Sequence, residues 1–370
     1  MAQTLILTGL ERTEWKKKVL REYTRDTGFT PYMGASANDI IHTIADEKGG
    51  YTIRVPLIAR LQATGVSGNT QLTGNEEQLD QYYKDVTWAY YRNAVKMSKF
   101  DIEKSASDVW GTATPQLRDW ASEHLKYAII NSFHTIQGTA YDAAAEATKD
   151  AWLAANADRV LFGAAVANNS SNDHSASLAN VDSTADKLSP SIISLAKRRA
   201  RIASPHIRPF KTGTQGREYY VMFAHPLCFR DLKENSTMTA ANRDARPRDV
   251  DANPLFQDGD LIYDGVIIRE IPEFYTARQG AGVNTKTHLS AVGASSIDVG
   301  ANFLCGAQSI AHVMHQAPEP TVSDITDYGF VKGVGIELAY GLEKLEWANG
   351  SGTRKDLGIS TIYCSAAADA

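Results

Sequence analysis

The sequence predicts a mixed α+β fold that includes a long β-hairpin. Two β-rich runs within residues 51–99 flank a Gly-rich connection, which is the pattern of an antiparallel hairpin. A long helix-forming stretch begins at residue 115. From residue 219 the chain alternates short strands and short helices without repeating βαβ units, which favours α+β over a parallel α/β sheet.

Composition is typical of a soluble globular protein. The 370 residues are 43% hydrophobic and 22% charged, enough for one elaborate domain or two to three ordinary ones. The net charge of −5 argues against a dedicated nucleic-acid reader, although local patches could contact DNA. No apolar run reaches the length of a membrane span, and the N-terminal apolar run precedes its charges, the reverse of a signal peptide. We therefore expect a protein that stays in the cytoplasm or leaves it by lysis.

The chain has three widely spaced cysteines, Cys228, Cys305 and Cys364. This spacing predicts neither a disulfide framework nor a cysteine metal knuckle. Buried free thiols in a reducing compartment are the simplest interpretation.

The N-terminal region combines a short helix with an irregular segment. Residues 10–23 have helical periodicity, with Trp15, Val19 and Tyr23 on one face. Residues 26–41 are polar, poorly periodic and punctuated by Gly and Pro. We expect this second segment to be an arm that lies on a surface, because such termini are ordered only when tied down.

The predicted hairpin has a connection of about 15 residues that contains Gly65, Gly68 and Gly74. A loop of this length in a compact domain usually marks function or disorder. An isolated two-stranded ribbon is marginally stable in water. The hairpin therefore either lies on another copy of the chain or forms a long surface loop on a monomer, and both readings stay open.

The longest predicted helix begins where Thr114 could cap it and Pro115 could open it. A helical region precedes it and is interrupted by Gly111. Gly138 is a candidate break, but a helix unbroken to Lys149 would span on the order of 50 Å. Its apolar stripe consists of Leu117, Trp120, Ala121, His124, Leu125, Ala128 and Ile129.

The second half of the chain is expected to be a polar loop, a helix and then several strands. Residues 167–190 form the loop, and Pro190 begins the helix. Strands are expected in 219–226, in 261–272 with a Tyr-Asp-Gly turn, in 301–316 running into a helix, in 327–347 as a Gly-interrupted pair, and in 357–367.

Motifs for catalysis or cofactor binding are weak. Gly333-Val334-Gly335 begins like a dinucleotide fingerprint, but Leu338 occupies the third glycine position and the predicted strand continues through it. The sequence has neither a P-loop nor a G-x-S-x-G nucleophile elbow. We predict no enzyme activity and no cofactor.

Metal binding is also not expected. His312 and His315 are three residues apart and could share a helix face, but a metal site would need a third ligand that the neighbouring sequence does not suggest. Glu76 and Glu77 lie on the predicted loop, a poor place to raise a carboxylate pKa by burial. We interpret them as interface or solvent charges.

A basic cluster follows Pro190 and is dense for a net acidic chain. It could contact phosphate, pair with acidic residues of a neighbouring subunit, or be a solvated helix face, and the sequence does not choose among these. Its members are Lys197, Arg198, Arg199, Arg201, Arg208 and Lys211.

Six stretches together resemble one known family. They are, in chain order, WKKKVLREY, YTIRVPLIARLQATGVSGNTQLTGNEEQL, YYVMFAHP, NPLFQ, YDGVIIRE and FLCGAQSI. In this order they are similar to the major capsid proteins of tailed phages, which adopt the Hong Kong 97-type capsid fold. GVSGNTQLTGNEE is the most specific segment, and the resemblance covers roughly residues 15–363. The polar segment 167–190 departs from the family pattern.

The resemblance implies a domain organisation for the whole chain. It implies an N-terminal arm at 1–50 and an extended loop at 51–100. A peripheral domain with a spine helix would occupy 101–204, an axial domain 205–320, and strands returning to the peripheral domain 321–370.

The resemblance also implies a function. The chain would self-assemble into the hexamers and pentamers of an icosahedral phage head around double-stranded DNA. Its partners would be further copies of itself and packaged DNA, with scaffold, decoration and portal proteins as further candidates, and without a membrane. It would reside in the virion after assembly in the host cytoplasm. A cellular nanocompartment shell of the same fold and an enzyme with an unrecognised site are the alternatives.

Two groups of residues are the expected contact sites. The extended loop would contact a neighbouring subunit through Gly65, Gly68, Gly74, Asn75, Glu76 and Glu77. DNA or a neighbouring subunit would be contacted by Lys197, Arg198, Arg199 and Arg201.

Overall fold

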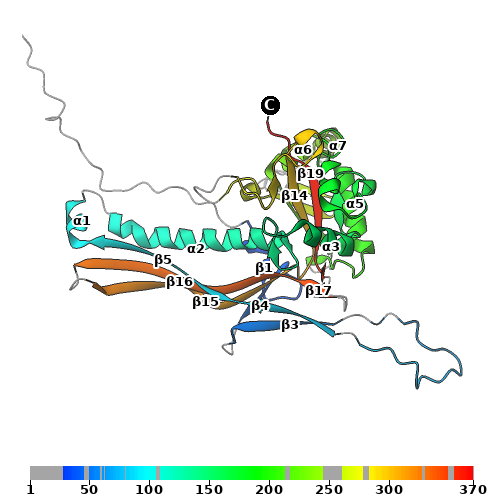
Figure 1. Ribbon diagram of the computed structural model, residues 1–370, viewed down its shortest axis with the longest axis horizontal. Coiled ribbons are helices and arrows are strands. Elements are labelled where there is room, and N and C mark those ends of the chain that lie inside the picture. Colours follow the sequence, from blue (N-terminus) through cyan, green and yellow to red (C-terminus); the bar gives the residue numbers. More distant parts are fainter. Residues whose placement is uncertain are drawn as a thin grey trace, which may run out of the picture. The chain divides into compact units, whose positions relative to one another are not determined.

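A computed structural model describes residues 28–45, 50–58, 61, 63–79, 81–105, 109–212, 217–244, 261–277, 283–326, 330–348 and 354–369. The helix expected at 10–23 lies outside them. The described chain forms two compact units (Figure 1). The first comprises Ala89–Leu125 and Gln316–Ala339, and the second comprises Gly28–Trp88, Lys126–His315 and Tyr340–Ala370. Among the described residues, no helix is both long and apolar enough to cross a membrane.

The second unit is built on an eight-stranded mixed sheet. Its main path runs β11 (Leu261–Tyr263), β12 (Val266–Glu270), β10 (Arg217–Ala224), β14 (Val299–Cys305), β19 (Ile359–Ser365) and β8 (Val160–Phe162). Two short strands, β9 (Phe210–Thr212) and β13 (His288–Leu289), pair with β10 and β14. The β10–β12 and β19–β8 pairs are parallel, and the other pairs are antiparallel.

Both faces of this sheet are covered. All seven residues of β14 and of β19 are buried, as expected for central strands enclosed on both sides. Helices α5 (Pro190–Ile202) and α6 (Pro226–Glu234) cover the face that carries Met222. The alternate residue Phe223 contacts Phe133 of the long helix on the other face, with ring centroids 5.3 Å apart. The α+β fold class predicted from the sequence is confirmed.

The segment expected to lie loosely on a surface contributes to the core from Gly28 onward. It contains η2 (Thr30–Tyr32), β1 (Met33–Gly34) and β2 (Ile41–Ala45). Phe29 is fully buried, with its ring centroid 5.0 Å from that of Phe223. The apolar side chains of this segment, although not spaced with a helical or strand period, therefore pack into the core and hold the segment in place.

The predicted hairpin is present but shorter than expected. Strand β3 (Thr52–Ile58) pairs antiparallel with β4 (Gln81–Thr87) over its full length. The next strand, β5 (Ala89–Ser98), leaves the hairpin and joins a five-stranded sheet of order β1-β2-β15-β16-β5. Trp88 marks the junction, where its indole Nε1–H donates to Gly50 O at 2.6 Å. The β3–β4 pairing therefore ends at Thr87, and β5, which lies within the predicted 51–100 segment, pairs with β16 far along the chain.

The first unit contains β5 and the distal parts of β15 (Ile310–Thr326) and β16 (Val331–Lys344). Gly335 lies in β16, and a Cβ there would come within 2.7 Å of Thr321 Oγ1 and 3.1 Å of Asn93 O. Gly335 is therefore required by the close approach of the strands, and no phosphate-binding turn forms there. Helix α1 (Lys99–Lys104) follows β5 and is capped by Ser98, whose hydroxyl accepts from the Asp101 N–H.

The long helix α2 (Val109–Phe133) differs from the prediction at both ends. Pro115 lies inside it and Thr114 does not cap it. The residue four positions before the proline is Gly111, which leaves room for the local adjustment that an internal proline demands. The helix ends before Gly138. This glycine lies in the turn between β6 (Thr135–Ile136) and β7 (Thr139–Ala140) and has a φ of 81°. Its 25 residues span about 38 Å, and α3 (Glu146–Asn156) is separate.

Residues 167–190 are a folded segment and only partly the loop that was expected. They include the end of η3 (Val166–Asn168) and the helix α4 (His174–Ala179). Asp186 organises the segment, because its carboxylate accepts from the Ala164 N–H at 2.7 Å and the Asp182 N–H at 3.0 Å. The polar side chains thus satisfy backbone groups, which composition alone does not reveal.

Residues 301–316 do not run into a helix as expected. They continue from β14 into β15, whose Ile310 pairs in parallel with Ile41 of β2. The predicted turn before β12 is confirmed, with Asp264 and Gly265 at φ values of 47° and 70°. All three cysteines are buried and free.

Candidate assembly surfaces

The root of the hairpin, formed by Thr52–Val55 and Lys84–Thr87, packs its inner face on other elements of the second unit. Val86 of β4 is fully buried in a small cluster with Ala311, Val313 and Leu345. Opposite it, Ile53 and Val55 of β3 pack against the same cluster. This alternation fixes the hairpin register, because a slip by one residue would turn these side chains outward.

A buried lysine reinforces the register. Lys84 is only 6% exposed, and its Nζ lies 3.2 Å from Glu346 Oε2 and 3.4 Å from Glu343 Oε2. Arg354 adds a second cation 3.5 Å from Glu346. Burial raises the pKa of Glu343 above its ordinary value. These ion pairs fix the position of β4 relative to β17 (Glu346–Ala348), because a shifted strand would leave a buried charge without a partner.

The outer face of the root carries an exposed ion pair. The Arg54 guanidinium donates from Nε and Nη2 to the two oxygens of Asp85, at 2.7 and 3.0 Å, across the hairpin. It also lies over the ring of Tyr83, 3.9 Å from the centroid. The hydrogen bond from Arg54 lowers the pKa of Asp85. This pair orients the side chains of the outer face but adds little to the stability of the protein, because water screens the two charges.

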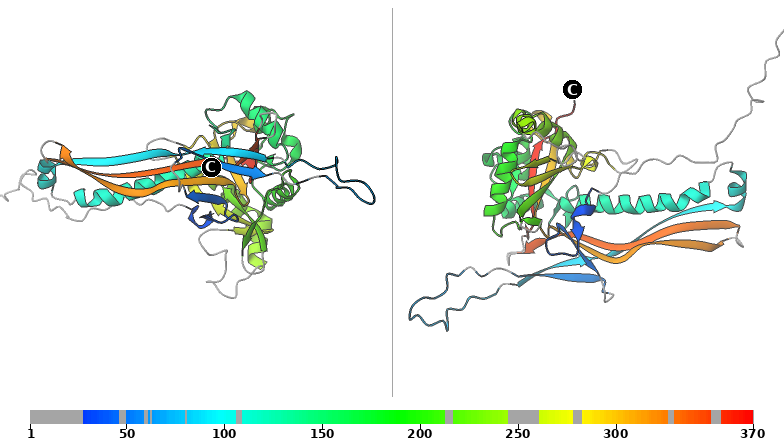
Figure 2. Two further views of the ribbon diagram at one scale, coloured as in Figure 1. Left: turned by 90° about the horizontal axis from the view of Figure 1, so that it is seen from below. Right: turned by 180° about the vertical axis from the view of Figure 1, so that it is seen from behind.

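The loop between β3 and β4 stands clear of the other elements of its unit (Figure 2). Gly65, Gly68 and Gly74 have φ values of 70°, 64° and 91°, and a Cβ on any of them would meet nothing within 4 Å. They are therefore required by backbone conformation and not by crowding. The loop owes its course to left-handed turns.

The two loop glutamates have internal partners. Glu77 Oε2 accepts from the Ala63 N–H at 2.8 Å across the loop, and Glu76 Oε2 accepts from the Gly74 N–H at 2.7 Å. The Asn75 side-chain amide donates to Gln71 O at 2.9 Å. The predicted loop residues are thus brought together, with both glutamates acting as backbone acceptors on an exposed loop.

Exposed apolar side chains on the hairpin were missed by the sequence analysis. They recur along the distal strands and the loop, where a monomer gains nothing by exposing them. The exposed fractions are 63% for Ile58, 61% for Leu61, 58% for Leu72 and 45% for Leu79. Such a group on one protruding element is a candidate interaction surface. The signal in the sequence was leucine within an otherwise polar, Gly-rich stretch.

The basic residues of α5 do not form one uniform surface. Lys197 Nζ lies 2.8 Å from Asp264 Oδ1, and its hydrogen bond lowers the pKa of that carboxyl. Arg199 donates to the carbonyl of Asp158 at 3.2 Å. Arg198 and Arg201 are exposed, and the Arg201 side chain also hydrogen-bonds to Tyr220. Lys197, Arg199 and Arg201 therefore have partners within the subunit, while Arg198 and Arg201 are accessible at the surface.

His312 and His315 do not share a face, because they lie at odd spacing on a strand. His312 is buried with Nδ1 3.3 Å from Thr43 Oγ1, while the ring of His315 stacks on Trp88 at a centroid distance of 3.9 Å. Both rings therefore make contacts within the fold.

Comparison with known proteins gives one consistent answer. The sequence matches a family model described as phage capsid protein over residues 3–368. It is 26% identical over 378 residues to the major capsid protein of Pseudomonas phage KPP25, covering 97% of this chain and 96% of that one. The fold is similar to the capsid asymmetric unit of cyanophage Pam1, with a TM-score of 0.87 and 34% identity over 100% of both chains. It also resembles the capsid of Ralstonia phage GP4, with a TM-score of 0.70 and 18% identity over 100% of this chain and 99% of that one.

Proposed function

We propose that the β3–β4 hairpin is the segment by which each subunit binds a neighbour. The premise is that this chain belongs to the phage capsid protein family and is a phage major capsid protein. The chain has the Hong Kong 97-type fold, forms part of the virion and assembles with copies of itself. The observation that carries the proposal is the group of exposed apolar side chains on the hairpin.

Binding of the hairpin to a neighbouring subunit is favoured because part of the hairpin is already ordered in the isolated chain. The root is fixed by Val86 and Lys84, so only the distal strands and the loop lose freedom when they bind. Preorganisation lowers the entropic cost of association. The left-handed glycines Gly65, Gly68 and Gly74 give the loop the freedom to follow neighbours in different symmetry environments.

The proposal also covers the assembly of the whole shell. The subunits form the hexamers and pentamers of an icosahedral head around double-stranded DNA, assembled in the host cytoplasm with scaffold, decoration and portal proteins as further partners. The domain plan follows the resemblance, with an arm at 1–50, a peripheral domain at 101–204, an axial domain at 205–320 and returning strands at 321–370. The extended loop is narrower than first expected, since the pairing of β3 with β4 ends at Thr87.

The hairpin proposal predicts loss of assembly in the double variant Leu72→Ser, Leu79→Ser. Both side chains are exposed in the isolated chain, so the variant should fold normally while losing the apolar contacts to its neighbour. Sedimentation and negative-stain microscopy of the full-length protein should show closed shells or capsomers for the natural sequence and only small species for the variant.

Gln71→Ser is the matched control, because it changes an exposed polar side chain of the same loop. Shells of normal size and yield from the double leucine variant would refute the hairpin proposal. Equal loss of assembly in the control would show that any change in the loop is disruptive.

We further propose that Arg198 and Arg201 contact phosphates of the packaged DNA. Both are exposed, although Arg201 also hydrogen-bonds to Tyr220, whereas Lys197 and Arg199 are half-buried and bind Asp264 and Asp158. In the variant Arg198→Gln, Arg201→Gln, the dependence of DNA affinity on salt concentration should weaken by about two counterions.

The measurement is a titration of unassembled subunits with double-stranded DNA at several salt concentrations. Lys104→Gln, an exposed lysine on α1, serves as the control for a simple change in net charge. An unchanged salt dependence in the arginine variant would contradict the DNA contact. Loss of shell stability without a change in DNA affinity would assign the arginines to a neighbouring subunit instead.

A further inference from the structure

Two of the three buried cysteines meet on one face of the eight-stranded sheet. Cys228 belongs to α6 and Cys364 to β19, and both lie in the hydrophobic cluster on the face covered by α5 and α6. Cys364 pairs in register with Gly300 of β14. Residues directly opposite each other in an antiparallel pair project to the same face, with Cβ atoms about 4.5–5.5 Å apart. A side chain at position 300 would therefore stand beside that of Cys364.

The sulfur of Cys228 occupies the space that a side chain at position 300 would fill. A Cβ on Gly300 would come within 2.9 Å of Cys228 Sγ, closer than the two atoms can approach. The same sulfur lies 3.4 Å from Ser365 O and 3.9 Å from Cys364 O. The glycine thus lets the thiol of α6 lie against the main chain of β19 at Cys364. A disulfide requires Cβ atoms about 3.5–4.5 Å apart, and this approach brings the two residues close to that range.

The third cysteine lies away from this contact, although it belongs to the same pair of strands. Cys305 pairs with Ile359, five positions along β14 from Gly300. The odd offset places its side chain on the opposite face of the sheet, and five residues correspond to about 17 Å along a strand. The second unit therefore contains one cysteine pair and one single cysteine.

Both thiols of the pair are free and fully buried. Burial raises the pKa of the Cys228 thiol to about 12 and holds that of Cys364 well above its ordinary value. At neutral pH the closed structure therefore contains almost no thiolate, which is the form that attacks a disulfide. Oxidation of the pair consequently requires a local opening of the second unit.

We propose that Cys228 and Cys364 form a disulfide within the chain when the protein meets an oxidising medium. During an opening, one cysteine thiolate attacks a small-molecule disulfide such as oxidised glutathione, and the other displaces glutathione from the mixed disulfide. The cysteines lose two electrons, and the two glutathione thiols that form carry away the two protons. Reducing cytosol keeps such thiols free, so we assign the bond to the particle after its release.

The bond would join α6 to β19 between residues that are 136 positions apart. A cross-link of this span restricts the unfolded chain, so the oxidised protein should resist unfolding.

The test is a thiol count on the full-length protein, equilibrated with oxidised glutathione in urea below the unfolding transition so that local openings occur. Labelling of parallel samples with N-ethylmaleimide establishes that all three thiols are reached under these conditions. The free thiols should fall from three to one per chain. Peptide mapping without reductant should recover fragments that contain Cys228 and Cys364 joined by a disulfide, and the urea midpoint should rise on oxidation.

Alanine variants of the cysteines give opposite predictions, and each removes one buried thiol. Cys305→Ala keeps the pair and should pass from two free thiols to none, with the same rise in the midpoint. Cys364→Ala should form no disulfide within the chain and show no rise. Three thiols that stay free although the label reaches them would overturn the proposal. So would a disulfide that includes Cys305 or one that joins two chains on a non-reducing gel.

Discussion

Replacing Lys344 by methionine is expected to cost about 3–5 kcal/mol of the free energy of unfolding, the scale for breaking a buried ion pair. Lys344 Nζ lies 3.0 Å from Asp356 Oδ2, and the two side chains are 2% and 1% exposed. The ammonium also donates to Thr135 O at 2.6 Å, and the Trp152 indole donates to Asp356 Oδ2 at 3.2 Å. The pair therefore links β16, β18 (Arg354–Asp356) and α3 in the second unit.

The loss has a specific origin. Burial already raises the pKa of Asp356, and Lys344 is the largest influence opposing that rise. Without the lysine, the carboxylate is a buried charge with one oxygen, Oδ1, that already lacks a hydrogen-bond partner. Protonation would relieve the charge, so the deficit should shrink as the pH falls.

Urea unfolding of the assembly-deficient Leu72→Ser, Leu79→Ser background provides the measurement, since shells would obscure the equilibrium. The double replacement Lys344→Met, Asp356→Asn should recover most of the lost stability, because no buried charge remains. Arg54→Met, which breaks an exposed pair, should leave the midpoint unchanged. An equal loss in the single and double replacements would show that packing, and not charge, is responsible.

Local patterns predicted the elements whose partners are close in sequence. The two β-rich runs around the Gly-rich connection predicted the β3–β4 hairpin, whose strands are joined by the loop that contains Gly65, Gly68 and Gly74. Pro190 opens α5 as expected, because proline is favoured in the first turn. The whole-chain resemblance then supplied the Hong Kong 97-type fold, whereas the physical patterns alone had predicted only the α+β class.

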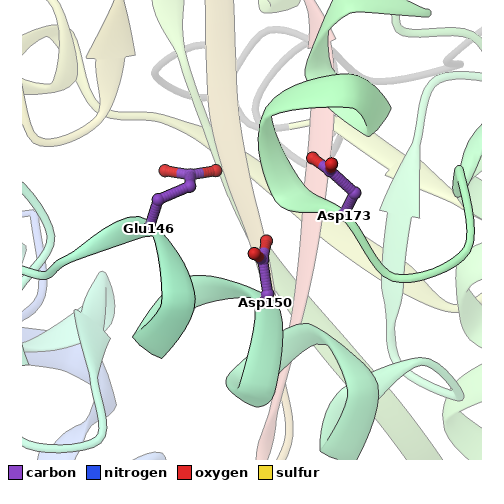
Figure 3. Close-up of side chains that lie close together, drawn as sticks. All are labelled: Glu146, Asp150 and Asp173. Carbon is purple, nitrogen blue, oxygen red and sulfur yellow. The ribbon is translucent and has the colours of Figure 1, made fainter.

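The errors share a different cause, which is a distant partner. Residues 89–98 are as β-rich as the hairpin, but their pairing with β16 is decided by residues more than 200 positions away. His312 and His315 have helical spacing, yet parallel pairing with β2 makes their segment a strand. Glu146, Asp150 and Asp173 lie close together only because α4 folds back on α3 (Figure 3). Propensity does not encode such contacts.

Acid is expected to destabilise the second unit through buried neutral histidines. Burial lowers the pKa of His134 and of His225 to about 3 and that of His312 to about 4, against an ordinary value of 6.5. In each case the unfolded chain binds a proton that the folded chain refuses. Stability is therefore complete above about pH 6.5 and declines as the pH falls toward the folded pKa values.

The contacts explain why these rings refuse a proton. His134 Nε2 lies 2.7 Å from the Tyr363 hydroxyl, and its Nδ1 contacts the Lys286 carbonyl, so Nε2 can accept only while it is unprotonated. His225 Nε2 lies 3.3 Å from His288 Nδ1, while its own Nδ1 has no hydrogen-bond partner. His312 Nε2 also lacks one. A second proton on the ring of His225 or His312 would be a buried charge without an acceptor, and on His134 it would break the hydrogen bond that Nε2 accepts from Tyr363.

Each histidine should contribute about 1.4 kcal/mol per pH unit, so the three together give a slope of about 4 kcal/mol per unit between about pH 5.5 and pH 4.5. Urea midpoints measured over this window should fall steeply for the assembly-deficient background. Among single replacements, His312→Asn should flatten the slope by about one proton, whereas exposed His206→Asn should not change it. A slope unaffected by His312→Asn would mean that His312 already takes up its proton in the folded state. The acid lability would then come from His134 and His225 alone, or also from carboxylates such as Asp158, whose pKa is lowered to about 2 by hydrogen bonds from Arg159 and Lys355 despite its partial burial and which would act at lower pH.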